Sequence, residues 1–180
     1  RAVAPDLGDR IVTLNGVSKS YCMTGWRIGY GAAPAPLIKA MAKLQSQSTS
    51  CPNSIAQHAA IAALDGPTDF MADNLAAFAG RRTLVVDALN AMPGITCLNP
   101  DGAFYVYPEI SGLIGKRCHD GRVIESDSDF VAYVLEQGEV AVVPGVAFGL
   151  SPCFRISYAE SDNVLRAALG RIAGVVASLA

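Results

Sequence analysis

A lysine and an arginine eight residues apart lie near the start of the chain, each close to a short apolar run. Lys19 follows the apolar run Ile11–Leu14 and the small turn Asn15–Gly16. Arg27 lies inside the apolar segment Trp26–Tyr30. The two runs predict two short neighbouring strands, on which buried cations are costly unless they are paired or neutralised. A phosphorylated aldehyde would satisfy both, because the Lys19 amine could condense with it to an imine and the Arg27 guanidinium could pair bidentately with the phosphate.

The same stretch resembles the cofactor-lysine signature of the aspartate aminotransferase-like enzymes. These are the class I and II aminotransferases of the fold-type I pyridoxal phosphate group. The signature residues are Asn-Gly-Val-Ser-Lys at 15–19 and Thr-Gly-Trp-Arg-Ile-Gly-Tyr at 24–30. The resemblance covers essentially all 180 residues, and it is specific for the family but not for the substrate. Further segments that resemble the family, in the family's order, lie at residues 45–50, 55–57, 101–105, 143–145 and 154–159.

The resemblance implies a role for each of three side chains. Lys19 would form the internal aldimine with pyridoxal 5′-phosphate and, once an amino acid displaces it, would carry the α-proton as general base. Arg27 would bind the cofactor phosphate. Arg155 lies in the predicted strand Phe154–Tyr158, opposite its apolar face, and the matching family position binds the substrate α-carboxylate through a bidentate pair. The competing interpretations are a surface lysine, a structural ion pair of Arg27 and a solvent-exposed Arg155.

The resemblance predicts the C-terminal portion of an aminotransferase rather than a whole enzyme. Chains of the family are considerably longer, and the part before the lysine carries the aspartate that faces the pyridine nitrogen and the phosphate loop. This chain begins with Arg1, in a segment typical of the middle of a protein. The parent enzyme is expected to be a homodimer that moves an amino group between an aspartate-like or broader amino acid and a 2-oxo acid, while the fragment alone is expected to be inactive. The alternatives are a lyase or synthase of the same fold, or a non-catalytic fragment.

Composition and charge exclude several other classes of function. The net charge is −2 with acids and bases interspersed, so the chain has no basic stripe for nucleic acid. No apolar run approaches the ~20 residues of a membrane span and no signal-peptide pattern is present, so we expect a cytoplasmic protein without a membrane partner. The five cysteines lack C-x-x-C spacing, and three consecutive residues such as Cys118–Asp120 rarely converge on one ion. We therefore expect reduced thiols and no metal.

The sequence predicts an α/β fold in two parts. Residues 1–70 are expected to be the C-terminal part of the pyridoxal phosphate-binding large domain of a fold-type I transferase, and residues 71–180 an interdomain helix followed by an α+β small domain. Two prolines open the first helix, and Asn53 and Ser161 are expected to cap later ones. We expect strands at 11–14, 26–30, 103–107, 140–143 and 154–158, helices at 34–44, 55–64, 71–89, 130–138 and 161–179, and a polar surface loop at 108–127.

Overall fold

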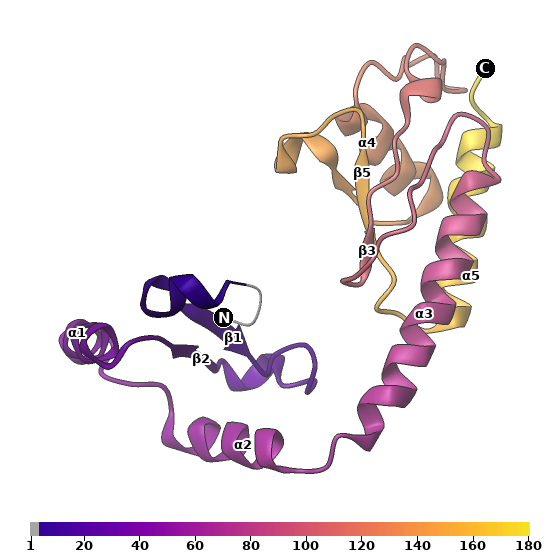
Figure 1. Cartoon of the computed structure of the whole chain (residues 1–180). Coiled ribbons are helices and arrows are strands. Elements are labelled where there is room, and N and C mark those ends of the chain that lie inside the picture. Colours follow the sequence, from indigo (N-terminus) through magenta and orange to yellow (C-terminus); the bar gives the residue numbers. More distant parts are fainter. Residues whose placement is uncertain (1–3) are drawn as a thin grey trace. The chain divides into compact units, whose positions relative to one another are not determined.

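The chain forms two compact units, divided between Ala72 and Asp73 (Figure 1). The computed structural model describes residues 4–180. The first unit contains a small hydrophobic cluster, whereas the second encloses the main core. Within the described residues, no helix is long and apolar enough to cross a membrane.

The first unit contains a two-stranded hairpin whose strands are mostly exposed. A 3-10 helix, η1 (Pro5–Arg10), precedes strand β1 (Thr13–Gly16). Strand β1 pairs antiparallel with β2 (Gly29–Ala32), and the long connection between them contains a second 3-10 helix, η2 (Thr24–Trp26). The hairpin therefore holds the two ends of this connection together.

Both strands begin later in the chain than the sequence predicts. The predicted bounds, 11–14 and 26–30, are wrong by a few residues at each end. Ile28 packs into the small hydrophobic cluster instead of entering a strand. Arg27 has a φ of 51°, a left-handed conformation that interrupts an extended chain. The apolar residues around Arg27 therefore anchor the connection rather than extend β2.

The two helices of the first unit confirm the predictions made from their caps. Helix α1 (Ala35–Ser46) begins at the predicted proline-rich start, and none of its residues is buried. Helix α2 (Ser54–Asp65) is capped by Asn53, whose Oδ1 accepts hydrogen bonds from the backbone N–H groups of Ile55 at 2.8 Å and Ala56 at 3.2 Å. The cap satisfies two of the amides that a helix start leaves without an intrahelical partner.

A three-stranded antiparallel sheet and three helices line the main core of the second unit. The strand order is β3-β5-β4, so β5 is central and antiparallel to both neighbours. Helix α4 packs on α5, and an ion pair of 3.0 Å between Arg81 and Asp162 joins α3 to α5. The elements are α3 (Asp69–Asn90), β3 (Tyr105–Val106), the 3-10 helix η3 (Ser111–Leu113), α4 (Asp127–Gly138), β4 (Val143–Pro144), the 3-10 helix η4 (Gly145–Phe148), β5 (Phe154–Ser157) and α5 (Asp162–Ala177).

In the second unit the helices match their predictions better than the strands do. All three helices occur where the periodicity predicts them, and the Ser161 hydroxyl caps α5 by accepting a hydrogen bond from the Val164 N–H at 3.4 Å. The strands predicted at 103–107 and 140–143 are corrected to two residues each. Ala103 cannot extend β3, because its φ of 63° is left-handed.

The segment at residues 108–127 is largely exposed, as predicted for a surface loop, but several of its side chains are buried in the main core, which the prediction missed. Ile110, Leu113 and Ile124 are buried in the main cluster. Ile110 and Leu113 lie only three residues apart, but Gly112 and Gly115 interrupt the segment and Ile124 lies far from both, so no sustained periodicity indicates their burial. Asp127, at the end of the segment, is also buried.

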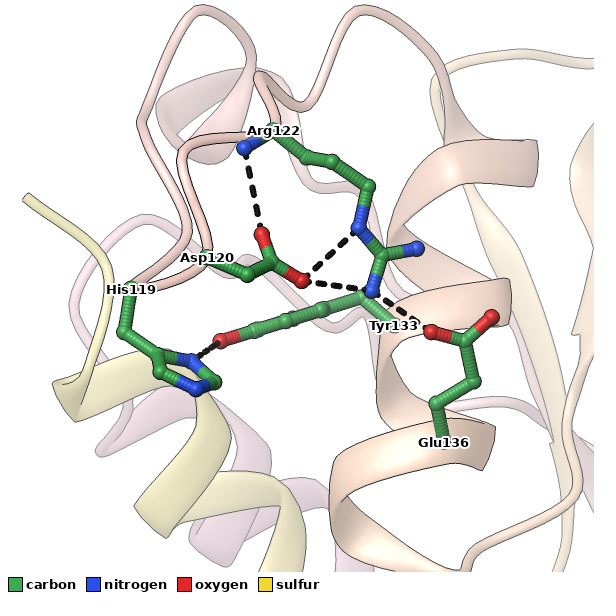
Figure 2. A network of polar contacts seen from close by, with 5 residues as sticks. All are labelled: His119, Asp120, Arg122, Tyr133 and Glu136. Atoms are coloured by element: carbon green, nitrogen blue, oxygen red, sulfur yellow. Dashed lines mark hydrogen bonds and ion pairs between the residues drawn. The ribbon is translucent and has the colours of Figure 1, made fainter.

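Polar contacts fasten the same segment to α4 (Figure 2). The Nδ1 atom of His119 lies 2.7 Å from the Tyr133 hydroxyl, and Arg122 forms ion pairs with both Asp120 and Glu136. The Arg122 guanidinium beside Asp120 holds the pKa of that carboxyl below its usual range. His119 and Asp120 therefore face different partners, and the network joins the segment to the helix.

Candidate cofactor and substrate site

The connection between β1 and β2, residues 17–28, carries both Lys19 and Arg27. Gly16 at the end of β1 lies opposite Gly29 at the start of β2, so the ends of the connection are adjacent. Lys19 follows shortly after β1, and Arg27 comes shortly before β2. Strand pairing thus brings the two cations into one loop, although the strands themselves do not contain them.

Two buried side chains anchor this loop to α2. Val17 and Ile28, the first and last residues of the loop, pack with two alanines of the helix. The Tyr21 N–H donates a hydrogen bond to the Val17 carbonyl at 3.2 Å, and the Cys22 N–H donates one to the Lys19 carbonyl at 3.1 Å. Lys19 therefore lies in a turn of a loop whose two end residues are held by packing against α2.

The side chains of Lys19 and Arg27 are both exposed, which corrects the expectation of buried charges. The flanking strands are themselves mostly exposed, so the hairpin has no interior in which to bury them. The Nη1 group of Arg27 donates a hydrogen bond to the Thr24 carbonyl at 3.0 Å. The guanidinium has further N–H donors, which a ligand could use.

A hollow of about 510 Å³ lies beside Arg27. Its volume falls in the range of small-molecule sites, ~300–1,000 Å³. Arg27 supplies a cation and Trp26 an apolar wall, a combination that suits a small anionic ligand with a ring. Among the described residues, the lining consists of Gly25, Trp26, Arg27, Asn53, Ile55 and Ala56, and Lys19 lies outside this set.

The third predicted residue, Arg155, lies on the central strand β5 of the second unit. The strand alternates as predicted, because Phe154 and Ile156 are buried while Arg155 is partly exposed on the other face. The Cζ atom of Arg155 lies 4.5 Å from the ring centroid of Tyr105 and 4.5 Å from that of Phe148. Within residues 4–180, the Arg155 side chain makes no hydrogen bond or ion pair, so its guanidinium N–H donors remain available to an anion.

The turn that carries Phe148 is held by side chains that sequence reasoning missed. The Oδ2 atom of Asp127 accepts hydrogen bonds from the Val146 N–H at 3.0 Å and the Ser151 hydroxyl at 2.5 Å. The Tyr107 hydroxyl lies 2.9 Å from the Gly145 carbonyl oxygen. Burial and the nearby Cys153 and Asp127 raise the pKa of Tyr107, while Arg155 opposes them. A neutral Tyr107 can therefore donate to the turn throughout the physiological pH range.

Sequence reasoning could find only part of the surroundings of Arg155. The ring neighbours of Arg155, Tyr105 and Phe148, come from other elements and leave no local signal. Asp127 follows a serine at a helix start, a position that usually indicates an exposed cap. Lys19 and Arg27 belong to the first unit and Arg155 to the second.

Comparison with known proteins connects both units to one family. The family model for aminotransferase class I and II matches residues 2–172. The chain is 59% identical to an aspartate/prephenate aminotransferase of Cereibacter sphaeroides over 98% of this chain and 44% of the relative. The crystal structure of an aspartate aminotransferase from Rhizobium meliloti superposes with a TM-score of 0.95 at 55% identity, covering 98% of this chain and 44% of that one. An aromatic aminotransferase from Pyrococcus horikoshii gives a TM-score of 0.81 at 36% identity, covering 94% and 43% respectively.

These likenesses confirm the predicted fold class and the predicted family. The chain spans less than half the length of the relatives that it matches. The likeness extends over nearly all of the chain, and so includes the loop of Lys19 and Arg27 as well as the strand of Arg155. The chain belongs to the class I and II aminotransferase family.

Proposed function

We propose that the chain is part of a pyridoxal phosphate-dependent aminotransferase that moves an amino group between an amino acid and a 2-oxo acid. The observation that carries this proposal is the loop at residues 17–28, in which an exposed lysine and an exposed arginine share one connection beside a hollow. Family membership supports the same activity. Because the chain spans 44% of the C. sphaeroides relative, we assign the activity to a longer parent enzyme.

The Lys19 amine and the Arg27 guanidinium together fit pyridoxal 5′-phosphate as the cofactor. The loop offers an amine and a guanidinium, and the hollow beside Arg27 has the volume of a small-molecule site. When bound, the cofactor supplies an electron sink for the carbanion formed at the amino acid's Cα. Lys19 would hold the cofactor covalently through its Nζ atom and, when released, move the α-proton with the same amine. Arg27 would hold the phosphate with its planar fork of N–H donors.

Arg155 would bind the substrate α-carboxylate. A guanidinium held by cation–π contacts keeps its N–H donors for hydrogen bonds, and these donors can pair bidentately with a carboxylate. Arg155 has both features, since its Cζ atom lies 4.5 Å from two ring centroids and its side-chain donors make no hydrogen bond or ion pair within residues 4–180.

Changing Arg155 to lysine in the complete enzyme is expected to raise KM for the amino acid by about tenfold or more, with a smaller change in kcat. A lysine ammonium cannot present two parallel N–H donors or lie flat against the rings. Steady-state kinetics with both substrates measure the effect. Arg166→Lys, at an exposed position of α5, is the matched control. An unchanged KM in the Arg155 variant would contradict the carboxylate assignment.

An acceptor test separates an aminotransferase from a lyase or synthase of the same fold. A ping-pong aminotransferase completes its turnover only when a 2-oxo acid removes the amino group. We therefore expect the complete enzyme, given an amino acid alone, to stop after about one equivalent per active site. Repeated release of ammonia and a 2-oxo acid without an acceptor would favour the lyase and contradict our proposal.

We propose an aspartate-like amino acid as the amino donor. The relative from C. sphaeroides is named an aspartate/prephenate aminotransferase, and that from R. meliloti an aspartate aminotransferase. An aromatic aminotransferase shares the fold at lower identity, so the fold by itself does not choose the substrate. Comparing kcat/KM for aspartate, phenylalanine and alanine in the complete enzyme tests the choice.

We further propose that residues 1–70 form the C-terminal part of the cofactor-binding large domain and residues 71–180 the interdomain helix and small domain. The division of the chain between Ala72 and Asp73 lies close to this boundary and supports it. Large apolar side chains of the first unit, including Leu44 at 74% exposure, offer surface that further parent chain and a second subunit would cover. We also propose that the parent enzyme is a homodimer in the cytoplasm. The five free cysteines are consistent with a compartment that keeps thiols reduced.

A further inference from the structure

Asp127 is unusual in the second unit because it is a buried carboxylate. It is only 2% exposed, and among the described residues it is the one buried charged side chain. A carboxylate is costly to bury unless hydrogen bonds replace its lost hydration. The Oδ2 atom of Asp127 receives two such bonds, and its place as the first residue of α4 adds the favourable field of a helix N-terminus.

Both hydrogen-bond donors belong to one turn, residues 145–151. Val146 lies in η4, and Ser151 lies just before β5, so one carboxylate oxygen ties the two sides of the turn together. The Tyr107 hydroxyl adds contacts to the same turn, 2.9 Å from the Gly145 carbonyl oxygen and 3.1 Å from that of Leu150. The turn has backbone hydrogen bonds of its own, from the Leu150 N–H to the Gly145 carbonyl at 3.3 Å and from the Gly149 N–H to the Val146 carbonyl at 3.1 Å. Side chains from outside the turn add further contacts that hold it against the start of α4 and against Tyr107, next to β3.

This turn presents Phe148 to the guanidinium of Arg155. The Phe148 ring centroid lies 4.5 Å from Cζ of Arg155, and the ring packs edge-on against Tyr107 at 6.1 Å. The second ring at Arg155 belongs to Tyr105 on β3, which the sheet itself fixes beside β5. One of the two aromatic contacts thus depends on the sheet, and the other depends on the turn that Asp127 holds.

We propose that Asp127 is a positioning residue for carboxylate binding: it fixes the turn 145–151 so that Phe148 holds the Arg155 guanidinium ready for a substrate carboxylate. This inference rests on the proposed function, because it needs Arg155 to bind the carboxylate. An arginine that is ordered before the substrate arrives loses less conformational freedom on binding. Asp127 itself touches neither substrate nor cofactor, and acts through Phe148.

Changing Asp127 to asparagine in the complete enzyme tests the inference. We expect KM for the amino acid and for the 2-oxo acid to rise about 5- to 10-fold, while kcat changes less than about twofold and the bound cofactor content stays the same. Asp129→Asn is the matched control, since Asp129 lies in the same first turn of α4 but bonds to Ser126. Phe148→Leu is a second variant at a half-exposed position, and it keeps the test open if the Asp127 variant does not fold.

A double-mutant cycle separates positioning from general destabilisation. If Asp127 acts through Arg155, adding Asp127→Asn to Arg155→Lys raises KM no further. Additive effects, or an unchanged KM in folded Asp127→Asn and Phe148→Leu enzymes, would overturn the inference. An Arg155→Lys enzyme with normal KM would overturn the proposed carboxylate site itself, so the two failures are distinct.

Discussion

Replacing Lys19 with alanine in the complete enzyme is expected to lower the transamination rate by about 10³-fold or more. Alanine has no amine to bond to the cofactor or to carry the α-proton, whereas the packing of the loop rests on Val17 and Ile28 and is retained. Because Lys19 is exposed, the change leaves no cavity in the described structure. The measurement is the single-turnover rate with an amino acid, which reports the proton transfer without product release.

Lys39→Ala is the control for this experiment. Lys39 is an exposed lysine of α1, outside the loop at residues 17–28, and its loss is expected to leave the rate unchanged. Equal activity of the Lys19 and wild-type enzymes would refute the catalytic assignment. Equal losses in both lysine variants would instead indicate an effect on folding, which the melting temperatures of the variants would show.

The second large effect is expected at Gly145, where alanine should lower the free energy of unfolding of the second unit by about 3 kcal/mol or more. A Cβ atom built there would lie 2.1 Å from the Leu150 carbonyl oxygen, 2.7 Å from that of Cys153 and 2.9 Å from the Tyr107 hydroxyl. Two of these three neighbours are backbone atoms, which cannot move aside as a flexible side chain does. The turn would have to open, and Phe148 would move with it.

Thermal unfolding of the complete enzyme measures this effect. We expect the transition to fall by about 5 °C or more and KM for the amino acid to rise in the same variant. Gly102→Ala is the control, since a Cβ at Gly102 would meet no described heavy atom within 4 Å. A Gly145→Ala enzyme with normal stability and normal KM would show that the turn tolerates the displacement.

Helices and their caps could be predicted because their signals are local. Asn53 and Ser161 each cap the helix that follows, and the apolar periodicity of α3, α4 and α5 lies within single segments. The strands were predicted less well because they are short, and short apolar runs do not determine strand bounds. Ile28, for example, packs against α2 from the loop instead of entering β2.

In the candidate site too, features that depend on neighbouring residues in the sequence could be predicted, and features that depend on distant segments could not. The alternation around Arg155 was visible in the sequence, and the structure confirms it. The rings of Tyr105 and Phe148 come together at Arg155 only when β3, η4 and β5 assemble. The burial of Asp127 likewise depends on a turn that approaches the start of α4, so no pattern within its own helix could reveal it.

The central claim is that Lys19 bonds covalently to pyridoxal phosphate, and reductive trapping tests it most directly. The complete enzyme is loaded with the cofactor, reduced with borohydride and digested, and the modified peptide is identified by mass spectrometry. We expect a single phosphopyridoxyl group on the peptide that contains Lys19. Modification of Lys39, Lys43 or Lys116, or of a lysine elsewhere in the parent chain, with Lys19 unmodified, would contradict it.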